Sequence, residues 1–125
     1  MMRQWVEFKG RPNVKGANEV RVTLNKKGVF LLNKKALEML GEPEAVKLFF
    51  DERNQSIGLG KATAEYENAF PVKSKDKYSN RTICASPFCR HNKVRVDSTI
   101  AFNNIEIDHD GIMALELHKA TVIGK

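Results

Sequence analysis

The chain has 125 residues, of which 42% are hydrophobic and 29% charged, and its formal net charge is +6. This length suits one ordinary domain, or two small ones that share a core, and no apolar run approaches the roughly 18 residues that a membrane span needs. The N-terminal residues also lack the apolar stretch of a signal peptide. We therefore expect a cytoplasmic protein with reduced cysteines and no membrane partner.

The charge alternates in four blocks along the chain. Residues 1–35 carry a net +7, residues 36–72 a net −4, residues 73–95 a net +6, and residues 96–125 a net −3. A surface without a special role mixes both signs along its length, whereas two basic stretches, each followed by an acidic one, indicate a unit used twice. The basic blocks favour a polyanionic partner such as nucleic acid. In the first block, we expect residues 1–19 to form an irregular basic N-terminal arm.

The pattern of apolar and turn residues over residues 20–62 predicts a first unit, with the order strand, turn, strand, helix, strand, turn, strand. The alternation of apolar and polar residues in Val20–Leu24 indicates a half-buried strand, and Gly28 suits the following turn because glycine tolerates positive φ. Asn33 is a good helix N-cap, and Gly41 is a good residue to end the helix. The other predicted elements are a strand over residues 29–32, a helix over 34–40, and strands over 45–50 and 56–59.

Residues 63–125 predict a second, diverged unit that repeats this pattern after a displacement of 53 positions. The strand before the helix falls on residues 82–85, and the capping asparagine falls on Ser86, which is also a capping residue. The third strand recurs around Phe102, and the fourth recurs around Ile112 after a turn that is two residues longer. Chance similarity between two β-rich stretches is the alternative, because few residues are identical, but the pattern and the charge blocks agree on one division.

The stretch Thr23–Gly41 has a polar turn ending in glycine, a short apolar strand, a basic amphipathic helix and Leu-Gly. This stretch resembles the core motif of the SpoVT/AbrB-type transcription regulators, although Asn33 replaces a usual proline and Val29 a usual basic residue. Two such units in one chain look like the arrangement of MraZ proteins, which are also regulators.

The resemblance implies a mainly β (α+β) fold, in which two tandem ββαββ swapped-hairpin-like units form a small pseudo-symmetric β-barrel with short helices. It leaves open whether the hairpins are exchanged within one chain or between chains. It also implies an oligomer that binds double-stranded DNA through basic residues of the first hairpin and of the helix start.

Candidate DNA-binding residues lie at the predicted hairpin tips and helix starts. Phosphate contacts need cations on a common face, and a hairpin tip with the adjacent helix start can supply one. Arginine or asparagine at a tip can also contact bases. The alternative is that these side chains are solvated and protect strand edges. The candidates are Arg21, Asn25, Lys26, Lys27, Lys34 and Lys35 in the first unit, and Lys73, Lys75, Lys77, Asn80, Arg81 and Arg90 in the second.

Few other residues suggest chemistry. Cys84, Cys89 and His91 form a C-x4-C-x-H cluster, but a structural zinc site usually has a second ligand pair, so we expect two small buried cysteines and no metal. The acidic run at residues 106–110 falls at a predicted hairpin turn, where aspartate and glycine are common. The sequence therefore predicts no catalytic residue, no cofactor and no enzyme activity.

Two functions remain open at this level. The first is a DNA-binding transcription regulator of the swapped-hairpin class that acts as a homo-oligomer. The second is a protein-interaction or structural module that self-associates through complementary acidic and basic blocks. An antitoxin-like role would usually bring a disordered acidic tail, and residues 115–123 look structured instead.

Overall fold

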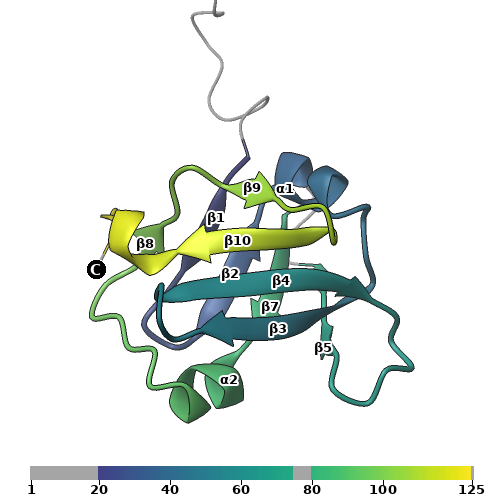
Figure 1. Cartoon of the computed structure of the whole chain (residues 1–125), viewed down its shortest axis with the longest axis horizontal. Coiled ribbons are helices and arrows are strands. Elements are labelled where there is room, and N and C mark those ends of the chain that lie inside the picture. The colour runs from purple at the N-terminus through teal and green to yellow at the C-terminus, as the bar shows by residue number, and fades with distance from the viewer. Residues whose placement is uncertain (1–19, 75–79, 125) are drawn as a thin grey trace, which may run out of the picture.

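The structure is a computed structural model that describes residues 20–74 and 80–124. In those residues the chain is mainly β, with two short α-helices and two antiparallel sheets (Figure 1), as the predicted α+β class requires. The predicted arm over residues 1–19, together with Lys75 and Lys77, lies outside the described residues. The elements in chain order are β1 (Val22–Leu24), β2 (Val29–Leu32), α1 (Lys34–Met39), β3 (Ala45–Asp51), β4 (Ser56–Ala62), β5 (Phe70–Pro71), β6 (Lys73–Ser74), β7 (Arg81–Cys84), α2 (Ser86–His91), β8 (Ile100–Ala101), β9 (Glu106–Ile107), β10 (Ile112–Glu116), the 3-10 helix η1 (Leu117–Lys119) and β11 (Thr121–Val122).

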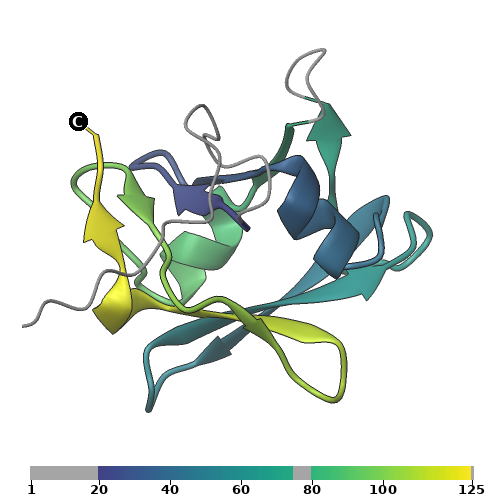
Figure 2. The ribbon, with the colours of Figure 1, turned by 90° about the horizontal axis from the view of Figure 1, so that it is seen from above.

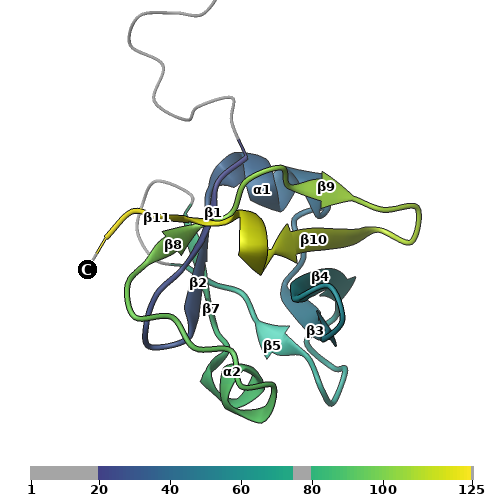
Figure 3. The ribbon, with the colours of Figure 1, turned by 60° about the vertical axis from the view of Figure 1, so that its left-hand side comes forward.

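Hydrogen bonds between antiparallel strands define the two sheets. The six-stranded sheet has the order β11-β8-β1-β2-β7-β6, and the five-stranded sheet has the order β5-β3-β4-β10-β9. Figure 3 shows β11, β8 and β1 side by side, and in Figure 2 the five-stranded sheet lies along the lower edge of the view. The helices α1 and α2 lie at opposite ends of the molecule, at the top and bottom of Figure 1.

Two stretches of chain pass from one sheet to the other. Val72 alone separates β5 from β6, yet β5 pairs with β3 in the five-stranded sheet and β6 pairs with β7 in the six-stranded sheet. Residues 102–105 separate β8, which pairs with β1, from β9, which pairs with β10. Bent strands that change sheets in this way form the corners of packed β structures. Asn104, with a φ of 55°, lies within the second of these corners.

The core contains side chains from both sheets. Phe30 lies opposite Ile83 in the β2–β7 pair, and Leu59 lies opposite Met113 in the β4–β10 pair; none of the four is exposed to solvent. The Phe30 ring stacks on that of Phe102, with ring centroids 6.3 Å apart. Burial of each such side chain stabilises the fold by about 1.5–3 kcal/mol.

Both helices end in the same way, although they are only six residues long. After α1, Gly41 has a φ of 85°, and the N–H of Glu42 donates a 2.7 Å hydrogen bond to the carbonyl five residues earlier. After α2, Lys93 has a φ of 57°, and the N–H of Val94 donates an equivalent bond of 2.8 Å. This is the Schellman arrangement, which satisfies carbonyls at a helix end. No helix in the described part of the chain has the length and apolar character needed to cross a bilayer.

Most predicted elements are found within one residue of their expected bounds, with four further differences. The first strand begins at Val22 rather than at residue 20, and the fourth extends to Ala62. Ser86 is the first helical residue of α2 rather than its cap, a position held by Ala85. The predicted third strand of the second unit is divided into β8 and β9, because the chain changes sheets between them. The prediction of a structured C-terminal segment is confirmed by β10, η1 and β11.

Candidate functional site

The turn between β1 and β2 presents two lysines at its tip. The Oδ1 atom of Asn25 accepts hydrogen bonds from the N–H groups of Lys27 and Val29, at 2.9 and 3.0 Å. Gly28 has a φ of 82° and donates its N–H to the Asn25 carbonyl. The Asn25 side-chain oxygen therefore holds the turn, and Lys26 and Lys27 are exposed.

This turn is fixed to the start of α2, in the other half of the chain. The hydroxyl of Ser86 donates a 2.6 Å hydrogen bond to the carbonyl of Lys27, 59 positions away in the sequence. The N–H of Ala85 donates a 2.8 Å bond to the carbonyl of Gly28. The contact is close enough that a Cβ on Gly28 would lie 2.9 Å from the Cα of Ser86. The position of the turn relative to α2 is thus set by direct hydrogen bonds.

An open groove of about 900 Å³ lies between the turn and α2, and we call it the basic groove. Five exposed cations and one exposed carboxylate, Asp97, line it. Its floor is apolar: Leu24, Cys89 and Val94 line it and are buried, and Val96 lines it and is half-buried. Within residues 20–74 and 80–124 the ion pairs are His109–Asp110 and Lys119–Glu116, and neither involves a side chain of the basic groove. Its cations are Lys26 and Lys27 from the turn, and Arg90, Lys93 and Arg95 from α2 and the segment after it.

A smaller depression of about 160 Å³ lies at α1 and contains two further predicted residues. Lys34 of α1 and Arg81 of β7 both line it, together with the carboxylate-bearing Glu42. The Arg81 guanidinium donates from Nη1 to the carbonyl of Asn80 at 3.1 Å. Each helix therefore lies beside the hairpin of the other half. The α1 depression is less positive than the basic groove, because it has two cations rather than five beside one carboxylate.

The predicted residues fall into separate groups rather than on one face. Because β2 and β7 are antiparallel, with Val29 opposite Cys84 and Leu32 opposite Arg81, the turn before β2 and the chain entering β7 lie at opposite ends of the six-stranded sheet. The turn lysines are grouped with α2, not with the adjacent helix start at α1. Asn25, Lys26, Lys27 and Arg90 share the basic groove; Lys34 and Arg81 share the α1 depression; Arg21, Lys35 and Lys73 are exposed outside both; and Asn80 is half-buried beside Arg81.

Sequence reasoning missed three residues of the basic groove. Lys93 and Arg95 end the second basic block, so their charge was visible in the sequence, and Asp97 begins the acidic block after it. Nothing in the local pattern indicated that this segment would fold back beside the first turn, because the contact depends on long-range strand pairing.

The cysteines differ from the expectation of two buried side chains. Cys89 is buried, and this burial raises the pKa of its thiol, whereas Cys84 is exposed. In the described residues, no group of three or more histidine, cysteine, aspartate and glutamate side chains is placed to hold a metal ion.

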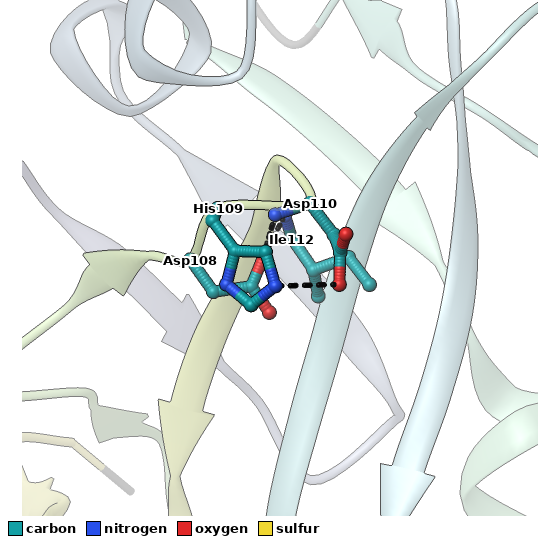
Figure 4. Close-up of polar contacts among 4 residues, drawn as sticks. All are labelled: Asp108, His109, Asp110 and Ile112. Carbon is teal, nitrogen blue, oxygen red and sulfur yellow. Dashed lines mark hydrogen bonds and ion pairs between the residues drawn. The ribbon is translucent and has the colours of Figure 1, made fainter.

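The acidic run at residues 106–110 includes a hydrogen-bonded hairpin turn (Figure 4). The Oδ1 atom of Asp108 accepts from the N–H groups of Asp110 and Ile112, at 2.8 and 3.0 Å. The ring of His109 lies 3.6 Å from the Asp110 carboxylate, with both side chains largely exposed. The two hydrogen bonds to Asp108 shape the turn, a role that is common for aspartate at such positions.

Comparison of the chain with protein-family models, with curated proteins and with solved structures found no match. The basic groove is the feature that bears on function: cations from two distant segments line one open cavity, and none of them forms an ion pair with a described residue. Such a concentration of one charge attracts anions and raises their local concentration.

Proposed function

We propose that the chain is a DNA-binding transcription regulator, without enzyme activity, that contacts the phosphates of double-stranded DNA with the basic groove. The observation that carries this proposal is the convergence of five exposed cations, from both basic blocks, around one cavity with a single carboxylate. Cations that contact phosphates displace condensed counterions from DNA, which supplies affinity without sequence recognition. Phosphate contacts are accordingly the part of DNA binding that the groove supports most directly.

The same proposal includes the swapped-hairpin fold, with tandem units over residues 20–62 and 63–125 around a pseudo-twofold axis. One supporting observation is that Phe30 lies opposite Ile83, because these positions differ by the same 53 residues as the sequence repeat. Equivalent residues meet in this way at a twofold axis. In the other sheet, β4 likewise pairs with β10, its counterpart in the second unit.

Pairing between the remaining strands also supports an exchange of segments between the two units. The bent strand formed by β5 and β6 precedes β7 as β1 precedes β2, and the bent strand formed by β8 and β9 corresponds to β3. Because β1 pairs with β8 and β5 pairs with β3, the first strand of each unit contacts the third strand of the other. With the two corners at Val72 and residues 102–105, this order would close the sheets into a small pseudo-symmetric barrel. In such a fold the hairpin of one unit meets the helix of the other, so both basic blocks are needed to build one groove.

The test is a titration of a fluorescent duplex of about 20 base pairs with the full chain at several salt concentrations. Each phosphate contact contributes a slope of about −0.9 in a plot of log affinity against log salt, so several contacts predict a steep line. The double variant K26E/K27E and the variant R90E should each weaken binding at least about tenfold. Lys61→Glu, an exposed charge reversal in β4 outside the basic groove, is the matched control. Equal affinities for wild type and both groove variants would remove the proposal.

A second function is favoured by the acidic turn at residues 108–111, whose charge is complementary to the basic groove. Asp108 and Asp110 are exposed, as is Glu106 in the adjacent strand. A second copy of the chain could place this turn in the basic groove, which would give a self-associating, non-enzymatic module with a head-to-tail contact. Light scattering without DNA, at low and high salt, tests this function: Asp110→Lys, in the turn itself, should abolish any salt-sensitive association. A chain that is monomeric at every salt concentration would exclude it.

A further inference from the structure

The basic groove has three properties that phosphate contact with a duplex does not require. It is concave, with a volume within the range of about 300–1,000 Å³ typical of small-molecule sites. Its floor is apolar, and it contains one carboxylate, Asp97, among the cations. We propose that the basic groove binds a ribonucleoside polyphosphate, and that this ligand and DNA exclude each other. The exclusion, unlike the binding, rests on the proposed DNA-binding function.

The cations stand on two sides of the groove, as a polyphosphate requires. Lys26 and Lys27 project from a turn that Asn25 and Ser86 fix through hydrogen bonds, so the lysine backbone is already positioned before a ligand arrives. Arg90 comes from α2 on the other side, with Lys93 and Arg95 following it. One guanidinium group can donate two parallel hydrogen bonds to two phosphate oxygens, and an ammonium group adds a compact positive charge.

The apolar floor suits the nucleoside part of such a ligand. Half-buried Val96 lines the cavity beside the buried side chains of Leu24, Cys89 and Val94, so it supplies apolar surface that is still open to water. Pockets that bind organic ligands combine such apolar surfaces with a few placed polar groups. A purine or pyrimidine face would pack on Val96 and remove its exposed surface from water, whereas inorganic phosphate would not.

Asp97 is the residue that points to a ribose. Its carboxylate weakens the attraction of the groove for phosphates, so an all-phosphate ligand gains nothing from it. A carboxylate accepts hydrogen bonds from sugar hydroxyls, and acidic residues in dinucleotide sites bind the ribose 2′-hydroxyl in this way. DNA has no 2′-hydroxyl, so Asp97 would favour a ribonucleotide over the DNA backbone at the same place.

Calorimetric titration of the full chain with ATP, dATP and inorganic tripolyphosphate, at about 0.1 M salt, tests the inference. ATP should bind with at least about tenfold higher affinity than either of the other two. Arg95→Gln and Lys93→Gln should each weaken ATP binding, whereas Lys61→Gln should not. Asp97→Asn should remove the preference of the chain for ATP over dATP. These are exposed side chains, and thermal melting of each variant checks its fold.

The outcomes separate this inference from the proposed function. If ATP displaces a bound fluorescent duplex and Asp97→Asn removes the preference for ribose, both are supported. If DNA binds but ATP does not, the inference is overturned and the proposed function stands. If ATP binds but DNA does not, the proposed function and the exclusion fail, and the nucleotide site remains. If tripolyphosphate binds as tightly as ATP, the assignment of a nucleoside ligand is wrong.

Discussion

Asn25 and Asp108 close two hairpin turns of the same construction, 83 positions apart in the sequence. In each, the side-chain Oδ1 atom accepts from the N–H groups two and four residues later, at 2.8–3.0 Å. In each, a glycine with a φ near 80° completes the turn: Gly28 in the first and Gly111 in the second. One turn carries two lysines at its tip, and the other carries a histidine and an aspartate. The same backbone device therefore presents opposite charges at two ends of the molecule.

The first prediction uses this pair. Asn25→Ala and Asp108→Ala each remove an acceptor of two backbone hydrogen bonds, so each should lower the free energy of unfolding by about 1–2 kcal/mol. Asn25→Asp and Asp108→Asn keep an oxygen in place and should cost less. Urea denaturation measures the change in stability. Only Asn25→Ala should also weaken DNA binding, because Asp108 lies in the other turn; equal losses of binding would contradict the role given to the first turn.

A second prediction concerns the contact between the first turn and α2. Gly28→Ala and Gly111→Ala both place a side chain at a φ near 80°, a strain of about 1–2 kcal/mol. The new Cβ at Gly28 would also lie 2.9 Å from the Cα of Ser86, whereas nothing lies within 4 Å of a Cβ at Gly111. Gly28→Ala should therefore destabilise the protein by at least about 1 kcal/mol more than Gly111→Ala. Equal midpoints in urea would show that the first turn can move away from α2.

The local sequence pattern was enough to predict the helix ends and strands that are determined by residues close together in the sequence. Asn33 caps α1 by accepting the N–H of Ala36 at 3.0 Å, and Gly41 ends the helix, both as predicted. The strand over residues 29–32 was also correct, because its apolar residues fit the buried centre of a sheet. Such features depend on side-chain chemistry at one place in the sequence.

Long-range pairing accounts for what the sequence did not predict. Lys93 and Arg95 belong to the basic groove only because β2 and β7 pair and place α2 beside the first turn. The hydroxyl of Ser86 was expected to cap its own helix, but it donates to the Lys27 carbonyl instead. The two halves of the third strand in the second unit separate where the chain crosses between sheets. None of these contacts has a signature in the neighbouring sequence.

A third prediction follows from the helix ends. Lys93 adopts the left-handed backbone conformation that Gly41 adopts after α1. In this conformation the Cβ of a residue other than glycine destabilises the fold by about 1 kcal/mol. Lys93→Gly should therefore stabilise the protein by about 0.5–1 kcal/mol in urea denaturation, while weakening the binding of anions to the basic groove. Gly41→Lys is the matched reverse change and should destabilise the protein. A loss of stability in Lys93→Gly would contradict this explanation.

The last prediction concerns the two cysteines. Exposed Cys84 should react rapidly with a disulfide reagent, whereas Cys89 should react slowly, because its thiol is buried and desolvation raises its pKa above the usual 9.0. Only the thiolate attacks the reagent, so Cys84→Ser should remove the fast phase and Cys89→Ser the slow one.

The raised pKa of Cys89 also makes the stability of the protein depend on pH. The unfolded chain loses the Cys89 proton first, so the stability contributed by the buried thiol is complete below pH 9.0 and declines as the pH rises above it. Unfolding in urea between about pH 8 and 10 should therefore show a steeper decline for wild type than for Cys89→Ala. Parallel declines would mean that Cys89 is equally solvated in the folded and unfolded chains.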